Sequence, residues 1–199
     1  MKLEDALLCL VVGSGALPEP GAGSDFCRRA VAGGADLIQW GVDDRERPEY
    51  GDELENIRAV CREEGALLVV DGDPVLALAA DVDGVHVSGA DVPIGYARSV
   101  LGEGRLIGLS SRSADEAAMA LDLEPDYLLH HEGTACSGVF AGLRAGRTVL
   151  YAAGIETLEQ AATLVNAGVF RLAIGWNAQS GRDVQVEMAA YSKLLGRCL

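Results

Sequence analysis

Two histidines and a glutamate stand next to one another at His130, His131 and Glu132, in a chain that has three histidines in all. Imidazole titrates near neutral pH and can give or take a proton, so this cluster is a candidate for general acid–base chemistry. If the cluster ends a strand, only one of the two histidines can face a ligand, because strand side chains alternate. For Cys136 we expect a buried, unreactive thiol, and for His86 structural hydrogen bonds.

Two aspartates, Asp71 and Asp91, form a second candidate set. Carboxylate oxygens are the ligands that Mg²⁺ prefers, so these residues predict at most a weak Mg²⁺ site and no other cofactor. Aspartate is also common in turns, and the alternative is that both residues only shape loops.

Residues suited to binding a ligand lie at the ends of other apolar runs or shortly after them: Gln39, Ser110, Arg112, Gly154 and Trp176. A guanidinium such as that of Arg112 can hold an anion through two parallel hydrogen bonds; alternatively, it pairs with Asp115 or Glu116 on the surface. The indole of Trp176 could stack on a flat ligand, or it could fill space in the protein. Together these residues predict a small-molecule ligand.

Eight short apolar runs must position these side chains. They are Ala6–Val12, Ala35–Trp40, Ala66–Val70, Gly84–Val87, Arg105–Ser110, Asp126–His130, Thr148–Ala153 and Phe170–Gly175. Helix-like segments alternate with them: Ser24–Ala32, Tyr50–Glu64, Pro74–Ala80, Gly95–Leu101, Ser113–Leu121, Thr157–Ala167 and Asp183–Leu195. Such alternation is typical of parallel strands joined by helices. After the sixth run the sequence is rich in glycine, so we treat it as a loop and expect the sixth helix to be short or missing.

Eight such units could form a closed barrel or an open, doubly wound sheet. The glycines after the first run are followed by Pro18 and Pro20, so they do not open a helix as a dinucleotide fingerprint would. The sequence therefore predicts one domain over residues 1–199, an α/β fold with a single (β/α)8 TIM barrel. Its chemistry should lie at the carboxyl ends of the strands, where all the candidate residues fall.

The composition restricts the partners. Thirty acidic residues against 16 basic ones give a formal net charge of −14, without the basic stripe that nucleic acid requires. The opening apolar run is short and follows Glu4 and Asp5, unlike a signal peptide or a membrane span. The five cysteines form no CxxC pair, which suits a reducing compartment. We expect a cytoplasmic protein that binds neither nucleic acid nor membrane, with a homo-oligomer left open.

The strand-end segments GGADLIQW, ALLVVDGDPVLAL, DGVHVSGADVP, RLIGLSSRS, PDYLLH, AAGI and AGVFRLAIGWNA resemble, in this order, the thiamine phosphate synthase and thiazole tautomerase family. The similarity runs from about Val31 to Ala178. It implies a barrel in which a pyrimidine methyl pyrophosphate ionises and a thiazole phosphate captures the cation, with Mg²⁺ present. The tautomerase branch uses a histidine near His130 or His131 as acid and base.

Several residues depart from what the resemblance implies for the synthase reaction. Gly41 and Asp43 stand where the family has an arginine and a lysine for pyrophosphate, and a carboxylate there would repel the anion. Gly72 replaces one metal aspartate, whereas Asp91 matches the other. Trp176 replaces the serine of the phosphate site. The sixth loop lacks the family's Thr-x-Thr-Lys segment.

Other positions agree with the family pattern: Ser110 matches the serine that contacts the pyrimidine, and Gly154 with Ile155 keeps most of a phosphate-binding turn. Three hypotheses follow. The first is a thiamine phosphate synthase-like protein with a degenerate pyrophosphate and metal site. The second is a divergent barrel that uses histidine and glutamate for acid–base chemistry on a small planar ligand, or only binds that ligand. The third is a non-catalytic scaffold.

Overall fold

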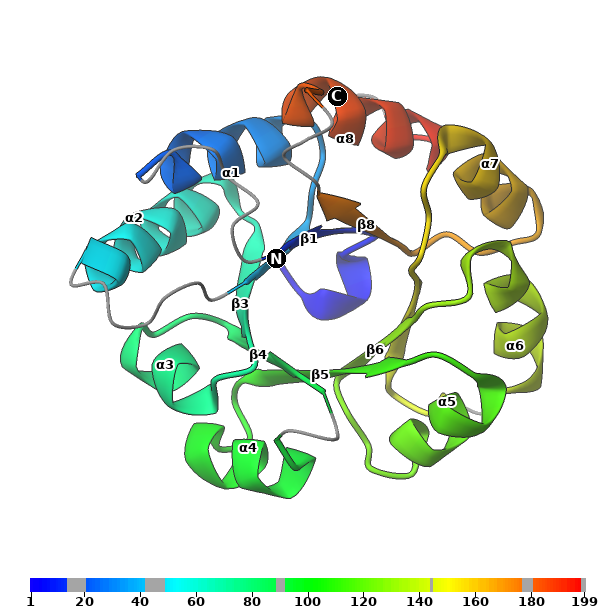
Figure 1. Ribbon diagram of the computed structural model, residues 1–199, viewed down its shortest axis with the longest axis horizontal. Coiled ribbons are helices and arrows are strands. Elements are labelled where there is room, and N and C mark those ends of the chain that lie inside the picture. The colour runs from blue at the N-terminus through cyan, green and yellow to red at the C-terminus, as the bar shows by residue number, and fades with distance from the viewer. Residues whose placement is uncertain (14–20, 42–48, 89–91, 144, 177–180, 198–199) are drawn as a thin grey trace.

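Eight parallel strands close into a barrel in which each strand neighbours the next along the chain and β8 returns to β1 (Figure 1). The strands are β1 (Leu8–Val12), β2 (Leu37–Trp40), β3 (Leu67–Asp71), β4 (Gly84–Val87), β5 (Leu106–Ser111), β6 (Tyr127–His130), β7 (Val149–Ala152) and β8 (Leu172–Trp176). This computed structural model describes all residues except 14–20, 42–48, 89–91, 144, 177–180 and 198–199. The predicted closed barrel is confirmed.

A ring of helices surrounds the strands (Figure 1). They are α1 (Gly23–Ala32), α2 (Glu49–Glu64), α3 (Pro74–Ala79), α4 (Ile94–Leu101), α5 (Ala114–Leu121), α6 (Cys136–Gly142), α7 (Leu158–Asn166) and α8 (Val184–Leu194). In the part of the chain that the structure describes, no helix has the length and apolar character to span a membrane.

The segment after β6, which the sequence led us to treat as a loop, contains a single 3-10 turn, η2 (Gly133–Ala135), and the short helix α6. Of the two expectations for the sixth helix, short or missing, the structure shows a short helix. Residues before β1 form another 3-10 turn, η1 (Leu3–Asp5), where the sequence pattern predicted the strand to begin at Ala6. Ala6 does have extended backbone angles, but the strand ladder begins two residues later, at Leu8.

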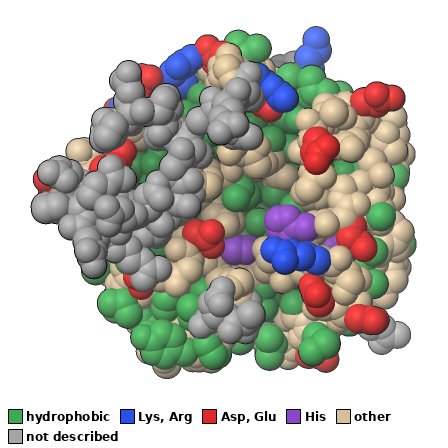
Figure 2. Space-filling view, in the orientation of Figure 1, with side chains coloured by type: hydrophobic (Ala, Val, Ile, Leu, Met, Phe, Trp, Pro, Cys, Tyr) green, Lys and Arg blue, Asp and Glu red, His purple; other side chains and the backbone are tan. Residues whose placement is uncertain are grey.

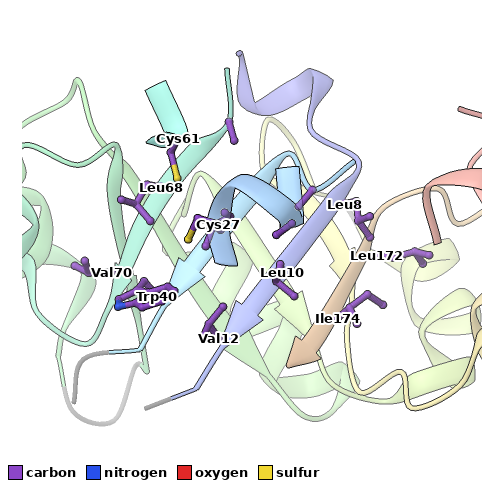
Figure 3. Packing of buried hydrophobic residues seen from close by; sticks show 14 of the residues in the cluster. Leu8, Leu10, Val12, Cys27, Trp40, Cys61, Leu68, Val70, Leu172 and Ile174 are labelled. Carbon is purple, nitrogen blue, oxygen red and sulfur yellow. The ribbon is translucent and has the colours of Figure 1, made fainter. Parts of the chain in front are cut away.

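Strand residues alternate between two apolar layers. The outer layer lies between strands and helices, and Figure 3 shows Leu8, Leu10 and Val12 along β1 with Cys27 and Cys61 from α1 and α2. The inner layer fills the barrel itself with residues that include Cys9, Leu37, Val69, Tyr127, Leu129 and Tyr151. This alternation determines which strand-end side chains reach the mouth.

Tyrosine rings fill the middle of the barrel. Tyr127 and Tyr151 are fully buried and meet edge to face with ring centroids 6.1 Å apart. The Tyr127 ring lies over Gly108 of β5, where a Cβ atom would overlap it. The Tyr151 hydroxyl donates a hydrogen bond to the carbonyl oxygen of Ala6 at 2.9 Å.

Three aspartates tie the amino ends of neighbouring strands together. Asp36, Asp83 and Asp126 directly precede β2, β4 and β6, and their carboxylates accept backbone N–H groups at the start of the preceding strand at 2.7 to 3.0 Å. Arg197, near the end of the chain, also donates to the buried Asp36 carboxylate at 2.7 Å. These contacts fix the end of the barrel opposite the mouth.

The junction of β7 with β8 is the barrel's shortest ladder. Its register contains one residue pair, Ala152 with Leu172, whereas every other neighbouring pair of strands has three to five. The residues that directly follow β7 leave the ladder and shape the mouth.

Candidate functional site

A pocket of about 400 Å³ opens at the carboxyl ends of the strands, lined by residues that include Val11, His131, Gly154, Ile155, Gly175 and Arg182. Figure 2 looks onto this mouth and shows histidine, basic and acidic side chains gathered near the centre of the face. The pocket lies where the carboxyl ends of barrel strands were expected to place the chemistry.

His130, the last residue of β6, points away from the mouth. It is fully buried, and its ring packs against Phe140 of α6 with centroids 6.0 Å apart. Its Nδ1 pairs with Ser111 Oγ at 2.8 Å and its Nε2 with Glu132 Oε2 at 2.9 Å. The sequence left open which of the two histidines faces the mouth; strand alternation turns His130 outward, and Glu132 is its hydrogen-bond partner there.

His131 faces the mouth and lines the pocket. Its Nε2 lies 3.1 Å from Ser110 Oγ, and this hydroxyl lies 2.9 Å from His86 Nε2. Partial burial lowers the pKa of His131, and the positive charge of Arg112 and the neighbouring His130 lower it further. A lowered pKa leaves His131 neutral at pH 7, so it can accept a proton or donate a hydrogen bond there.

Arg112 follows β5 and brings a positive charge to the same side of the mouth. Its backbone N–H, not its guanidinium, donates to Glu116 Oε2 at 2.7 Å. Within the described part of the chain its guanidinium makes no ion pair, so the expected pairing with Asp115 or Glu116 does not form. The charge is close enough to lower the pKa of His131 and is available to an anionic ligand.

Gln39 and Asp71 form the opposite wall of the barrel mouth. Gln39 is 4% exposed, and its Oε1 has no hydrogen-bond partner among the described residues. Burial raises the pKa of Asp71, and a hydrogen bond from the Gln39 side chain partly offsets this effect. Two acceptor groups therefore lie together on this side.

The described residues do not make a metal site on their own. No three histidine, cysteine, aspartate or glutamate side chains among them come together in a way that could hold a metal ion. Asp91, the other predicted Mg²⁺ ligand, lies outside the described residues, as do Asp43 and Asn177. The Mg²⁺ site therefore stays a prediction.

The turn after β7 presents backbone N–H groups to the pocket. Gly154 has a φ of +72°, which a residue with a side chain rarely adopts, and it packs closely against the backbone at Gly133. Neither the Gly154 nor the Ile155 N–H finds an acceptor among the described residues, whereas the Gly133 N–H donates to Ala153 at 3.0 Å. Unpaired N–H groups at a turn are suited to bind an anion.

Trp176 does not contribute to this pocket. Alternation along β8 directs Gly175 to the mouth and Trp176 to the outer layer, where the indole meets the Phe26 ring edge to face at 5.2 Å. The indole therefore fills space beside α1, which is the alternative that the sequence offered to stacking on a ligand. Gly175, which has no side chain, faces the pocket in its place.

Cys136 and His86 have the expected structural contacts. Cys136 is buried, donates its thiol to the His130 carbonyl oxygen at 3.2 Å, and has its pKa raised by burial. His86 bridges Ser110 and, through Nδ1 at 3.2 Å, the Tyr127 hydroxyl. Sequence reasoning missed Tyr127, although its place two residues before Leu129 and four before His131 marks the same strand face.

Comparisons with known proteins agree with this fold. The family model described as thiamine monophosphate synthase matches residues 8–176, from the first strand of the barrel to the last. The chain belongs to this family. The thiamine-phosphate synthase of Chlorobium luteolum is 32% identical over 184 residues, which span 84% of this chain and 82% of that protein.

Two further proteins illustrate the range of the similarity. The thiamine-phosphate synthase of Methanosarcina barkeri is 40% identical over 60% of this chain and 53% of its own length. A thiamine phosphate pyrophosphorylase from Pyrococcus furiosus superposes with a TM-score of 0.83 at 24% identity and covers 98% of both chains. That likeness supports the fold.

Proposed function

We propose that this member of the family binds a small planar ligand with one anionic group in the barrel mouth and transfers a proton at His131. The observation that carries the proposal is the position of His131, which lines the pocket, pairs with Ser110 and lies near the charge of Arg112. A neutral imidazole can take a proton from one atom of a ligand and return it to another, and the imidazolium that forms in between is balanced by the negative charge left on the ligand.

The anionic group would lie at the turn after β7. The unpaired N–H groups of Gly154 and Ile155 support this placement, and Arg112 supplies a guanidinium for hydrogen bonding to the same ligand. Gln39 and Asp71 would meet N–H donors of the ring, because the buried Oε1 of Gln39 has no partner among the described residues and the partly buried Asp71 carboxyl lies beside it. A phosphorylated heterocycle matches this division between donors and acceptors.

Thiamine phosphate synthesis is the second candidate function, favoured by family membership and by Ser110 at its family position. We propose that this activity is inefficient here. Gly41 stands where the resemblance expects an arginine for pyrophosphate, so that charge is missing from the site. Mg²⁺ would depend on Asp71 and Asp91 without the aspartate that Gly72 replaces, and we propose weak binding at most.

A thermal-shift and calorimetry panel tests the choice between these functions. The ligands are a thiazole carboxylate phosphate, thiamine phosphate, and pyrophosphate with Mg²⁺. A ligand that binds only the folded chain raises the melting temperature, and we expect the thiazole phosphate to do so and pyrophosphate to fail. Strong stabilisation by pyrophosphate with Mg²⁺ would overturn the argument from Gly41.

Two substitutions test the roles within the site. His131→Asn should reduce the rate of ring-proton transfer by about 10²- to 10⁴-fold. Arg112→Gln should weaken binding of the anionic ligand by about tenfold or more, because hydrogen bonds to charged groups are strong. Arg147→Gln is the matched control, since this exposed arginine lies before β7 at the other end of the barrel. Full turnover in His131→Asn would exclude the proposed chemistry.

A further inference from the structure

A chain of hydrogen-bonding groups runs from the barrel core to the pocket. The Tyr127 hydroxyl lies 3.2 Å from His86 Nδ1, His86 Nε2 lies 2.9 Å from Ser110 Oγ, and Ser110 Oγ lies 3.1 Å from His131 Nε2. The four side chains come from β4, β5, β6 and the residue after β6, and they share the inner face of the barrel. Two imidazoles are thus joined through one serine.

Which group donates and which accepts along these hydrogen bonds is determined at the buried end, at Tyr127. Tyr127 is fully buried, and burial raises its pKa, so the hydroxyl keeps its proton. Among the described residues its oxygen has one hydrogen-bond partner, His86 Nδ1. If Nδ1 carried a hydrogen, the tyrosine proton would be buried without an acceptor, which folded proteins avoid. Tyr127 therefore donates and His86 Nδ1 accepts.

The remaining protons follow from this first one. His86 is 4% exposed, and burial lowers its pKa to about 3, so its single ring proton is on Nε2 and is donated to Ser110. Ser110 has no other partner within the described chain than the two histidines. Its hydroxyl proton must then go to His131 Nε2. His131, neutral at pH 7, carries its own proton on Nδ1.

We infer that Tyr127 and His86 are positioning residues that, through Ser110, hold His131 as the Nδ1–H tautomer. Its Nε2 is occupied by the serine, so the Nδ1–H is the group left to donate to a lone pair of a ligand in the pocket. The ligand class that fits is a heterocycle with a ring nitrogen or carboxylate acceptor. This consequence rests on the proposed function, whereas the tautomer itself does not.

Nitrogen-15 NMR of histidine-labelled protein tests the inference without substrate, because long-range proton–nitrogen correlations distinguish protonated from unprotonated ring nitrogens. We expect Nε2–H at His86 and Nδ1–H at His131. In Tyr127→Phe the ring still covers Gly108 while the donor is lost, so both histidines should become mixtures of tautomers. His130, which pairs with Ser111 and Glu132, is the internal reference.

Tyr151→Phe is the matched control, because it removes the other buried tyrosine hydroxyl. That hydroxyl donates to Ala6 and takes no part in the hydrogen bonds that link Tyr127 to His131. The variant should leave all three histidines unchanged. If Tyr127→Phe does not fold, Ser110→Ala carries the test and should release His131 from the Nδ1–H form. An Nε2–H form of His131 in the unaltered protein, or equal effects of the two tyrosine variants, would overturn the inference. The assigned tautomers without proton transfer would overturn only the proposed function.

Discussion

At the scale of single residues, the two adjacent histidines have opposite roles. Strand alternation predicted that only one could face the mouth. It did not predict which one, because the sequence does not show at which residue β6 ends. The structure turns His131 to the pocket and buries His130 against α6. For the same reason Trp176, attractive from its position in the sequence, faces the outer layer.

His130→Asn should lower the free energy of unfolding by about 2 to 3 kcal/mol, because it breaks buried hydrogen bonds to Ser111 and Glu132 and leaves space beside Phe140. The exposed His131→Asn should change it by about 0.5 kcal/mol or less. Urea unfolding of both variants measures the difference. Equal losses would mean that the two side chains have the same burial in solution.

The charge of Arg112 should be visible in the titration of its neighbour. Partial burial, Arg112 and His130 lower the pKa of His131, so removing the cation in Arg112→Gln should raise that pKa toward its ordinary value. The protonated fraction of His131 at pH 6 should increase accordingly. A pH titration by NMR measures this, with Arg147→Gln expected to leave the curve unchanged. An unaltered curve in Arg112→Gln would place the guanidinium away from the imidazole.

At the scale of secondary structure elements, local signals were the most informative. Ser113 and Thr157 were identified as helix starts, and their side chains do accept the N–H groups of Glu116 and Gln160. The aspartates that join strands could not be recognised in this way. Asp36 binds the N–H of Leu8, 28 residues earlier, and such a contact has no spacing rule to reveal it.

The packing of β5 against β6 depends on one missing side chain. Gly108→Ala should lower the free energy of unfolding by about 1 to 3 kcal/mol or more, because the new methyl group overlaps the Tyr127 ring in the filled barrel. Gly104→Ala is the control, since nothing lies within 4 Å of a Cβ there. Thermal and urea unfolding should therefore separate the two alanines. A neutral Gly108→Ala would show that the barrel interior can shift to accept it.

At the scale of the whole molecule, three of the few basic residues of this acidic chain gather around one aspartate at the end opposite the mouth. Asp81 forms ion pairs with Arg58, Arg62 and Arg105, which bring α2 and the start of β5 together. Hydrogen bonds from Arg105 and Arg62 lower its pKa to about 2. Composition predicted the net charge, but the place where opposite charges meet required the fold.

Acid unfolding should report this network. Because the folded-state pKa of Asp81 is lowered from 3.8, its contribution is present above about pH 4 and disappears as pH falls through about 2. Asp81→Asn should unfold more easily at pH 7, and its difference from the unaltered chain should shrink on acidification. Asparagine tolerates the positive φ of 53° at this site. A difference independent of pH would contradict the assignment, and Asp122→Asn provides an exposed control.

The single-pair ladder makes the junction of β7 with β8 the part of the barrel wall with the shortest register, and it lies beside the Gly154 turn that lines the pocket. Amide protons of β7 and β8 should exchange with deuterium sooner than those of β2 and β3, because fewer bonds must open. A ligand that contacts both Gly154 and β8 would connect the two strands where their ladder is short. Ligand binding should then slow amide exchange most at this junction, so that occupancy of the pocket and closure of the barrel are linked there.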